Sequence, residues 1–205
     1  MEPVDKYITI QKKRVHYIAA GSSEKLGVIF LHGARFSAKD WLSTGSLTYL
    51  AGEGYGAYAL DLPGFGESER ISLMPQHFVK AFIEEVGFRR FVLVGPSMGG
   101  KIALLCALEK IEGIVGLVLI APDGLPSLKD RLKEIDIPVL LIWGDRDQVI
   151  PITDSEVLLM ETKRTRIWIL KGEGHAGYFN RSQEFNETLL DFLANIPDPA
   201  DSWLT

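Results

Sequence analysis

The chain contains six continuous apolar runs, each closing on a residue such as glycine, proline or aspartate that interrupts regular structure. They lie at 27–33, 56–64, 90–95, 113–122, 139–145 and 165–172. Uninterrupted apolar runs of this length are typical of strands buried on both faces, as in a parallel sheet. Stretches with helical periodicity lie between them, at about 38–52, 74–86, 98–110, 152–162 and 181–194. This alternation predicts a doubly wound α/β domain with helices on both faces of the sheet.

Two shorter segments precede this pattern. Residues 7–10 and 14–21 alternate between apolar and polar side chains, which predicts a half-exposed antiparallel hairpin at the start of the chain. The 205 residues contain no linker rich in Ser, Pro or Gly and no block of charge that would divide them. We therefore predict one domain over residues 1–205.

Charge and composition exclude several classes of function. The net charge is −5 and there is no basic run, which argues against nucleic acid as the main partner. The first twenty residues place lysine and arginine inside an alternating pattern, so we expect neither a signal peptide nor a membrane span there. Cys106 is the single cysteine, which rules out an internal disulfide and suits a reducing compartment. We expect a cytoplasmic protein in which Cys106 is inert core.

Residues capable of chemistry follow the predicted strands. In open α/β sheets the ligand site lies at the carboxyl ends of the strands. The polar segments 32–35, 61–68 and 145–147 each follow an apolar run, and so do Ser97 and His175. A serine, an acid and a histidine thus occur in the order Ser, Asp, His, far apart in the chain. Only the fold could bring them together.

The segment from Gly95 to Lys101 matches two catalytic motifs. It contains GxSxG, the nucleophile elbow of an acyl hydrolase, and GxxxxGK, most of a phosphate-binding P-loop. A P-loop needs Ser or Thr after its lysine, but position 102 is Ile, and Pro96 removes an N–H that would face phosphate. We interpret the segment as a nucleophile elbow, with Lys101 as a solvated helix residue or a member of an ion pair.

Five motifs in one consistent order carry a family resemblance. They are HGARFSAKDW at 32–41, DLPGFGES at 61–68, GPSMGG at 95–100, WGDRDQVIP at 143–151 and KGEGHAGYF at 171–179. With them the chain resembles the α/β-hydrolase superfamily over nearly its whole length. It is similar in particular to the small cap-less group that includes the transcription-factor-interacting factor B type. The resemblance implies a serine hydrolase that acts on esters or other activated acyl groups.

The predicted triad is Ser97, His175 and Asp147. A serine hydroxyl is a poor nucleophile unless a base takes its proton and a third group orients that base. His175 would be this base and Asp147 its partner. The family motif implies Asp147, because it places the acid directly before the pattern x-x-x-Pro, in which the proline is Pro151. Asp145, two residues away, would also reach the site. For the oxyanion we expect the backbone N–H groups of Met98 and Ala34 as donors.

Four neighbouring residues have more than one interpretation. His32 is expected to brace its loop and not to act as a catalyst. Arg35 would either form an ion pair with a nearby carboxylate or meet an anionic group of the substrate. Phe65 and Trp143 would either line the pocket or belong to the aromatic core.

The connection from Ala121 to Pro138 is too short for the cap domain that many α/β-hydrolases insert there. It leaves room for one short helix near 127–135, so the site should be open. We therefore predict a carboxylesterase that takes small, short-acyl ester substrates and needs neither cofactor nor metal. Two alternatives stay open: an acyltransferase with the same triad, and a non-catalytic interaction protein on a hydrolase scaffold. The sequence leaves any protein partner unknown.

Overall fold

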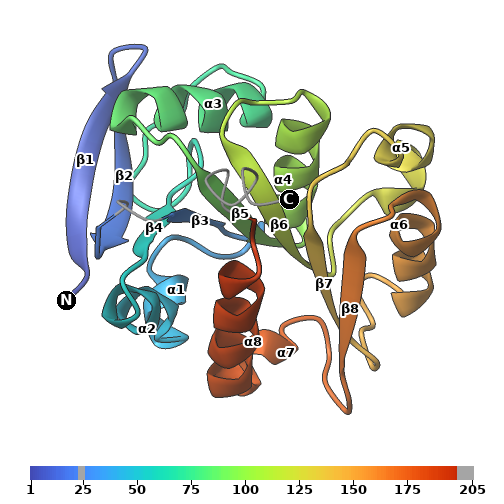
Figure 1. Ribbon diagram of the computed structural model, residues 1–205. Helices are drawn as coiled ribbons and strands as arrows, with labels where there is room; N and C mark the ends of the chain where they lie inside the picture. The colour runs from blue at the N-terminus through green and yellow to red at the C-terminus, as the bar shows by residue number, and fades with distance from the viewer. Residues whose placement is uncertain (23–25, 198–205) are drawn as a thin grey trace.

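The computed structural model describes residues 1–22 and 26–197. Its strands are β1 (Val4–Ile10), β2 (Lys13–Ala20), β3 (Gly27–Leu31), β4 (Gly56–Leu60), β5 (Phe91–Pro96), β6 (Ile114–Ile120), β7 (Val139–Gly144) and β8 (Thr165–Leu170). In the described residues they form an eight-stranded sheet in the order β1-β2-β4-β3-β5-β6-β7-β8 (Figure 1). β2 pairs antiparallel with β1 and β4, and the other pairs are parallel. The predicted mostly parallel sheet with an N-terminal antiparallel hairpin is confirmed.

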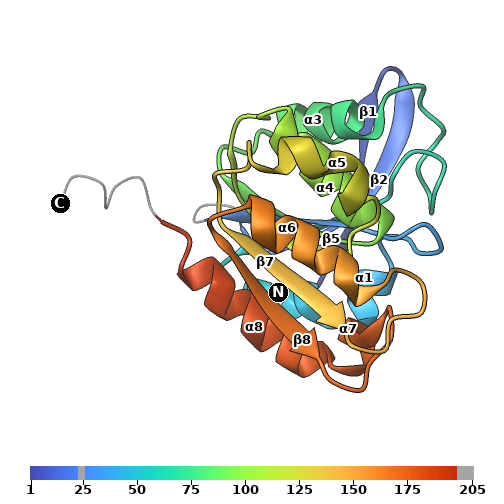
Figure 2. The ribbon, with the colours of Figure 1, turned by 90° about the vertical axis from the view of Figure 1, so that its right-hand side faces the viewer.

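Helices cover both faces of this sheet. They are α1 (Asp40–Ser43), α2 (Ser46–Gly52), α3 (Pro75–Val86), α4 (Met98–Leu108), α5 (Leu125–Leu132), η1 (Ile152–Asp154), α6 (Ser155–Glu161), α7 (Gly177–Asn180) and α8 (Ser182–Ala194). Figures 1 and 2 show α3, α4, α5 and α6 on one face and α1, α2, α7 and α8 on the other. The chain is a single compact α/β domain of three layers, although residues 198–205 of the predicted domain lie outside the described residues.

The apolar runs form strands because each side of the sheet needs its own core. In β3, Ile29 and Leu31 pack into the core under α3 and α4, while Val28 and Phe30 pack into the core under α2 and α8. Successive side chains of a strand point to opposite faces, so a strand covered on both sides must be apolar at every position.

Three local predictions were wrong. The stretch 38–52 forms two short helices and not one, because Gly45 between them has φ +70°. β2 is buried from Val15 to Ala20 and not half exposed, since both of its faces are covered. β8 is an edge strand and is partly exposed, although its apolar run indicated burial on both faces.

The connection from β6 to β7 holds α5 as its only helix, and no cap domain interrupts the described residues. None of the helices in residues 1–22 and 26–197 is long and apolar enough to cross a membrane.

Candidate active site

Ser97 occupies a sharp turn between β5 and α4. Its backbone has φ +49° and ψ −116°, a conformation that non-glycine residues rarely adopt. The turn is held on both sides, because Ser97 N–H donates to Ile120 O at 2.9 Å and Ser97 O accepts from Asp123 N–H at 3.1 Å. The Ser97 side chain makes no capping hydrogen bond to α4. Strain of this kind persists only where the surrounding structure enforces it, as at a nucleophile elbow.

The elbow also requires glycine at position 95. A Cβ atom on Gly95 would lie 2.4 Å from Gly99 C, so β5 and α4 could not approach as closely as they do. We expect Gly95→Ala to lower the free energy of unfolding by about 3 kcal/mol, through overpacking that the backbone cannot relieve. Urea denaturation measures this change. The matched control is Gly52→Ala at the end of α2, where an added Cβ meets nothing within 4 Å, and equal effects of the two substitutions would contradict the prediction.

Asp147 and His175 are paired. His175 Nδ1 lies 2.7 Å from Asp147 Oδ2, and the Asp147 side chain is fully buried while that of His175 is 20% exposed. The other carboxylate oxygen, Oδ1, accepts hydrogen bonds from Val149 N–H at 2.8 Å and Ile150 N–H at 3.0 Å. These contacts hold the carboxylate in one orientation. The imidazole is then oriented through Nδ1, which leaves Nε2 as the nitrogen able to act on a hydroxyl.

Asp145 has a different task. Its Oδ1 accepts the N–H of Gly172 at 2.7 Å, so it ties the loop after β7 to the loop after β8. Of the two acids between which the sequence left a choice, the structure therefore pairs Asp147 with the histidine.

The segment that carries His175 turns back across the carboxyl ends of the strands. Phe179 in α7 packs against Phe36 in the loop after β3, with ring centroids 5.5 Å apart, and Tyr178 packs against Trp41. The loops after β3, β5, β7 and β8 thus meet at one edge of the sheet. In the described residues no hydrogen bond joins Ser97 to His175, and such contacts often tighten only when substrate is bound.

The peptide between Gly33 and Ala34 has a fixed orientation. Gly33 O accepts from His32 Nδ1 at 2.8 Å and from Phe36 N–H at 3.1 Å. No peptide of the described chain is cis, and in a trans peptide N–H points opposite to C=O. The Ala34 N–H is therefore directed away from His32. Met98 N–H is the first amide of α4 and has no partner within the helix, so both predicted oxyanion donors are available.

His32 braces this loop, as predicted. It is buried, and its Nε2 accepts the N–H of Leu62 at 3.1 Å while its Nδ1 faces Gly33 O. That pattern needs the neutral ring with its proton on Nδ1. Burial lowers the pKa of His32, which keeps the ring neutral.

The remaining candidates separate into rim and core. Arg35 is exposed, and in the described residues it does not form the ion pair considered for it. Phe65 is partly buried, and its ring centroid lies 5.0 Å from that of His32.

Trp143 belongs to the core and does not line a pocket. It is fully buried, and its indole N–H donates to Ile150 O. Lys101 pairs with Asp123 at 3.4 Å, the ion pair considered for it.

Cys106 is buried in the core, and burial raises the pKa of its thiol, which makes it an inert group. Within residues 1–22 and 26–197, no three His, Cys, Asp or Glu side chains are grouped so that they could hold a metal ion.

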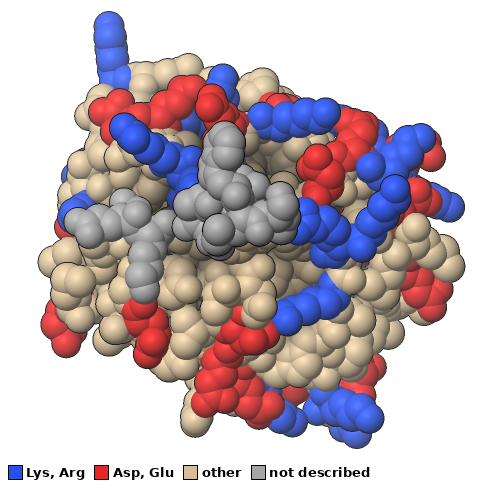
Figure 3. Space-filling view, viewed as in Figure 1, with Lys and Arg blue, Asp and Glu red and all other residues tan. Residues whose placement is uncertain are grey.

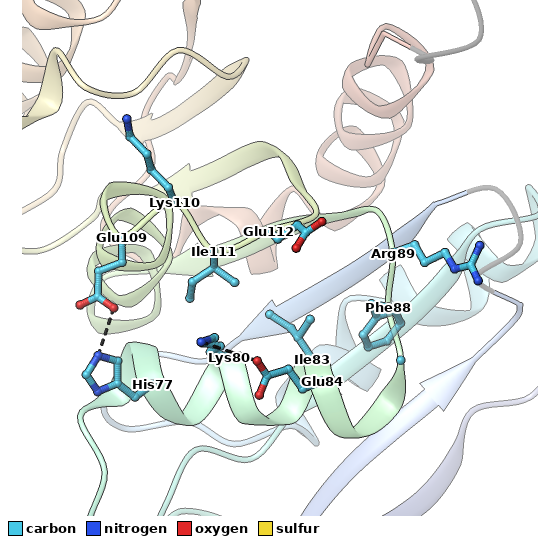
Figure 4. A pocket seen from close by; sticks show the side chains of 11 residues that line it. His77, Lys80, Ile83, Glu84, Phe88, Arg89, Glu109, Lys110, Ile111 and Glu112 are labelled. Atoms are coloured by element: carbon cyan, nitrogen blue, oxygen red, sulfur yellow. Dashed lines mark ion pairs between the residues drawn. The ribbon is translucent and has the colours of Figure 1, made fainter.

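A cavity of about 900 Å³ lies elsewhere, between α3 and the loop after α4 (Figure 4). Arg89 and Glu112 on its wall precede β5 and β6, so it opens at the amino ends of these strands, whereas Ser97 follows a carboxyl end. Two pairs of its lining side chains contact each other, His77 with Glu109 and Lys80 with Glu84. We do not assign the chemistry of the triad residues to this cavity.

Sequence reasoning did not single out two buried polar residues beside the site, His16 in β2 and Asp61 after β4. The available signal was a histidine inside an otherwise apolar strand and an acid at a strand end.

Comparison with known proteins identifies the family of the chain. Residues 28–133 match the model of the alpha/beta hydrolase family, and the chain belongs to that family. It is 31% identical to the Putative protein-lysine deacylase ABHD14B of Rattus norvegicus, over 86% of this chain and 87% of the relative. It is 35% identical to Protein ABHD14A of Danio rerio, over 84% of this chain and 66% of that longer protein.

The solved structures show the same fold. A predicted CIB-like hydrolase from Thermoplasma acidophilum has a TM-score of 0.90 and 29% identity, covering 95% of this chain and 99% of that one. The expected resemblance to a group of small α/β-hydrolases is therefore confirmed.

Proposed function

We propose that the protein is a serine hydrolase of the carboxylesterase type that cleaves short-acyl esters through an acyl-enzyme. The observation that carries the proposal is the 2.7 Å pairing of His175 with buried Asp147 at the edge of the sheet where the strained Ser97 turn lies. A scaffold without catalysis would have no need of this pair or of the strain, which argues against the non-catalytic alternative.

The same groups act in both half-reactions of the mechanism. Ser97 Oγ attacks the carbonyl carbon while His175 Nε2 takes the hydroxyl proton, and the negative charge that develops on the carbonyl oxygen is held by the N–H groups of Met98 and Ala34. The C–O bond to the alcohol then breaks and His175 returns the proton to the leaving oxygen. Water attacks the acyl-enzyme in the same way, giving the carboxylic acid and free Ser97. Asp147 stabilises the imidazolium in both halves.

The substrate should be small at its acyl end. The connection in which other α/β-hydrolases insert a cap holds α5 as its only helix in the described residues. No cap therefore encloses the acyl chain, and added methylenes would stay in water. A buried methylene contributes about 0.8 kcal/mol, roughly a fourfold gain in kcat/KM per carbon. We expect no such gain here. Instead, kcat/KM should be highest for acyl groups of roughly two to six carbons, and the enzyme should show no interfacial activation. Nitrophenyl esters from acetate to palmitate test this, and a maximum at long chains would contradict it.

Labelling with a fluorophosphonate tests the mechanism independently of the substrate. One equivalent of label on Ser97 is expected, and a protein that takes up none would not have an assembled triad. Adding an amine or thiol acceptor to the ester assay tests the acyltransferase alternative, since acyl transfer to the acceptor in preference to water would reassign the enzyme.

A second candidate is the hydrolysis of an acyl-lysine amide in a protein. Relatives named as lysine deacylases suggest it, and the uncapped connection would admit a substrate as large as a polypeptide. An acetyl-lysine peptide cleaved with a higher kcat/KM than a nitrophenyl ester would favour this candidate.

We propose further that the protein works in a reducing compartment such as the cytoplasm. Its single cysteine, which is buried, supports this proposal.

We propose that neither nucleic acid nor a membrane is a partner of the protein. Acidic and basic side chains are interspersed over the face in Figure 3, which supports this view, since an anionic polymer needs a basic surface.

A further inference from the structure

Asp61 is a buried acid that joins three separate segments. It is the first residue after β4 and is 1% exposed. Its Oδ1 accepts the N–H of Ala38 at 2.6 Å, while Oδ2 accepts the N–H of Glu67 at 2.8 Å and lies 2.7 Å from His16 Nδ1. The chain closes tightly around the carboxylate, since a Cβ on Gly66 would lie 2.0 Å from Oδ2. The carboxylate therefore connects these segments, beside the backbone hydrogen bond that Asp61 N–H donates to His16 O at 3.1 Å.

His16 links this carboxylate to the N-terminal hairpin. It lies in β2 with no exposure, and its Nε2 is 2.8 Å from Oδ1 of Asp5, an exposed residue of β1. Each ring nitrogen lies within hydrogen-bond distance of a carboxylate oxygen. The hairpin thus holds the buried Asp61 carboxylate through the His16 imidazole.

This cluster is not a second catalytic triad, although Ser68 is adjacent to it. Ser68 Oγ donates to Asp61 O at 2.8 Å and accepts the N–H of His16 at 2.9 Å, so its hydroxyl is already used. His16 has no exposed surface through which a substrate could reach it. The role of the cluster must lie in what it holds.

It holds the loop of the oxyanion hole. Asp61 binds Ala38 at the end of this loop, and the next residue, Leu62, donates its N–H to His32 at the start of it. Ala34 lies between these two anchors. A second, exposed contact joins the same two loops, because Lys39 Nζ donates to Glu67 Oε1 at 2.7 Å.

We propose that Asp61 is a positioning residue for the oxyanion hole and that His16 and Asp5 hold it from the N-terminal hairpin. The inference rests on the proposed function, in which Ala34 N–H stabilises the oxyanion. A preorganised donor acts on the transition state and not on the bound ester, so loosening the loop should lower kcat and leave KM nearly unchanged.

The experiment compares Asp61→Asn, His16→Leu and His16→Asn with the wild-type enzyme. Asp61→Asn keeps the shape of the side chain but leaves it one acceptor oxygen. The N–H donors that now bind two carboxylate oxygens would have to share it. His16→Leu removes the donor to Asp61, whereas in His16→Asn the side-chain amide can take the place of Nδ1 and donate to it. The measurements are kcat and KM on a short-acyl nitrophenyl ester and the affinity for a trifluoromethyl ketone that mimics the tetrahedral intermediate.

Asp61→Asn and His16→Leu are expected to lower kcat by about 10- to 100-fold with KM within about threefold of wild type. Affinity for the ketone should fall by the same factor as kcat/KM. His16→Asn should retain kcat within about threefold of wild type, a rescue that overall loss of stability would not produce. Folded Asp61→Asn and His16→Leu enzymes with kcat within about twofold of wild type would overturn the proposal.

The control is Gln76→Leu, which removes a buried polar contact between α3 and Glu109, the residue that follows α4. It should change the melting temperature but not kcat, and a loss of kcat would also overturn the proposal. If both buried variants fail to fold, Asp5→Ala at its exposed position decides: amide exchange in residues 33–38 should become about fivefold faster, and an unchanged rate overturns the proposal. A wild-type enzyme with neither esterase activity nor fluorophosphonate labelling would instead defeat the proposed function.

Discussion

Replacing Ser97 by alanine is expected to lower kcat on a short-acyl ester by about 10⁴- to 10⁶-fold, because the nucleophile and the base act as one unit. His175→Ala should cause a loss of similar size. The double variant should be scarcely slower than either single variant, since neither group accelerates acyl transfer without the other. Steady-state kinetics on nitrophenyl acetate measures all three losses, and titration with fluorophosphonate shows whether the label is lost from Ser97→Ala.

Ser127→Ala is the matched control, because this hydroxyl donates to Gly124 O at the start of α5 and takes no part in the proposed chemistry. It should keep the wild-type rate and the full label. A Ser97→Ala enzyme that retains more than a few per cent of the activity would mean that another residue is the nucleophile.

Asp147→Asn is expected to lower kcat by about 10⁴-fold while the fold is kept. The amide oxygen would remain with the Val149 and Ile150 N–H groups, so the NH₂ group would face His175 Nδ1. That contact favours the tautomer with its proton on Nε2, the nitrogen that must act as the base. Steady-state kinetics on a short-acyl ester measures the loss.

Asp145→Asn makes the same chemical change two residues away and serves as the comparison. Its amide oxygen can still accept the Gly172 N–H, so we expect kcat within about threefold of wild type. A larger loss for Asp145→Asn than for Asp147→Asn would reassign the acid.

The sheet could be predicted from the sequence because its core lies on both faces. A strand such as β5, whose residues are all buried, must be apolar throughout, and few other structures impose that pattern. The single helix predicted over 38–52 failed for a local reason: the apolar periodicity continues through Gly45, but the αL conformation of this residue ends α1 and reorients α2. Periodicity does not reveal the sign of φ.

The site was predictable only in part. Ser97 and His175 stand in two of the five motifs that carry the family resemblance, and the structure places their loops at one edge of the sheet. The choice between Asp147 and Asp145 depended on a family motif, because two acids two residues apart at a strand end are equivalent in sequence. His16 and Asp61 went unnoticed as a pair, since their contact spans 45 residues and crosses from one strand to the end of another.

Local pattern by itself determined the element types, the α/β class and the candidate residues for acyl transfer, because burial and backbone preferences act over a few neighbouring residues. Contacts between distant segments decided the rest. The tertiary structure selected Asp147 as the partner of His175, placed Trp143 in the core and left Arg35 at the rim. It also set the Ala34 N–H through His32, Leu62 and Asp61, because the direction of a hydrogen bond depends on where the fold brings its two partners.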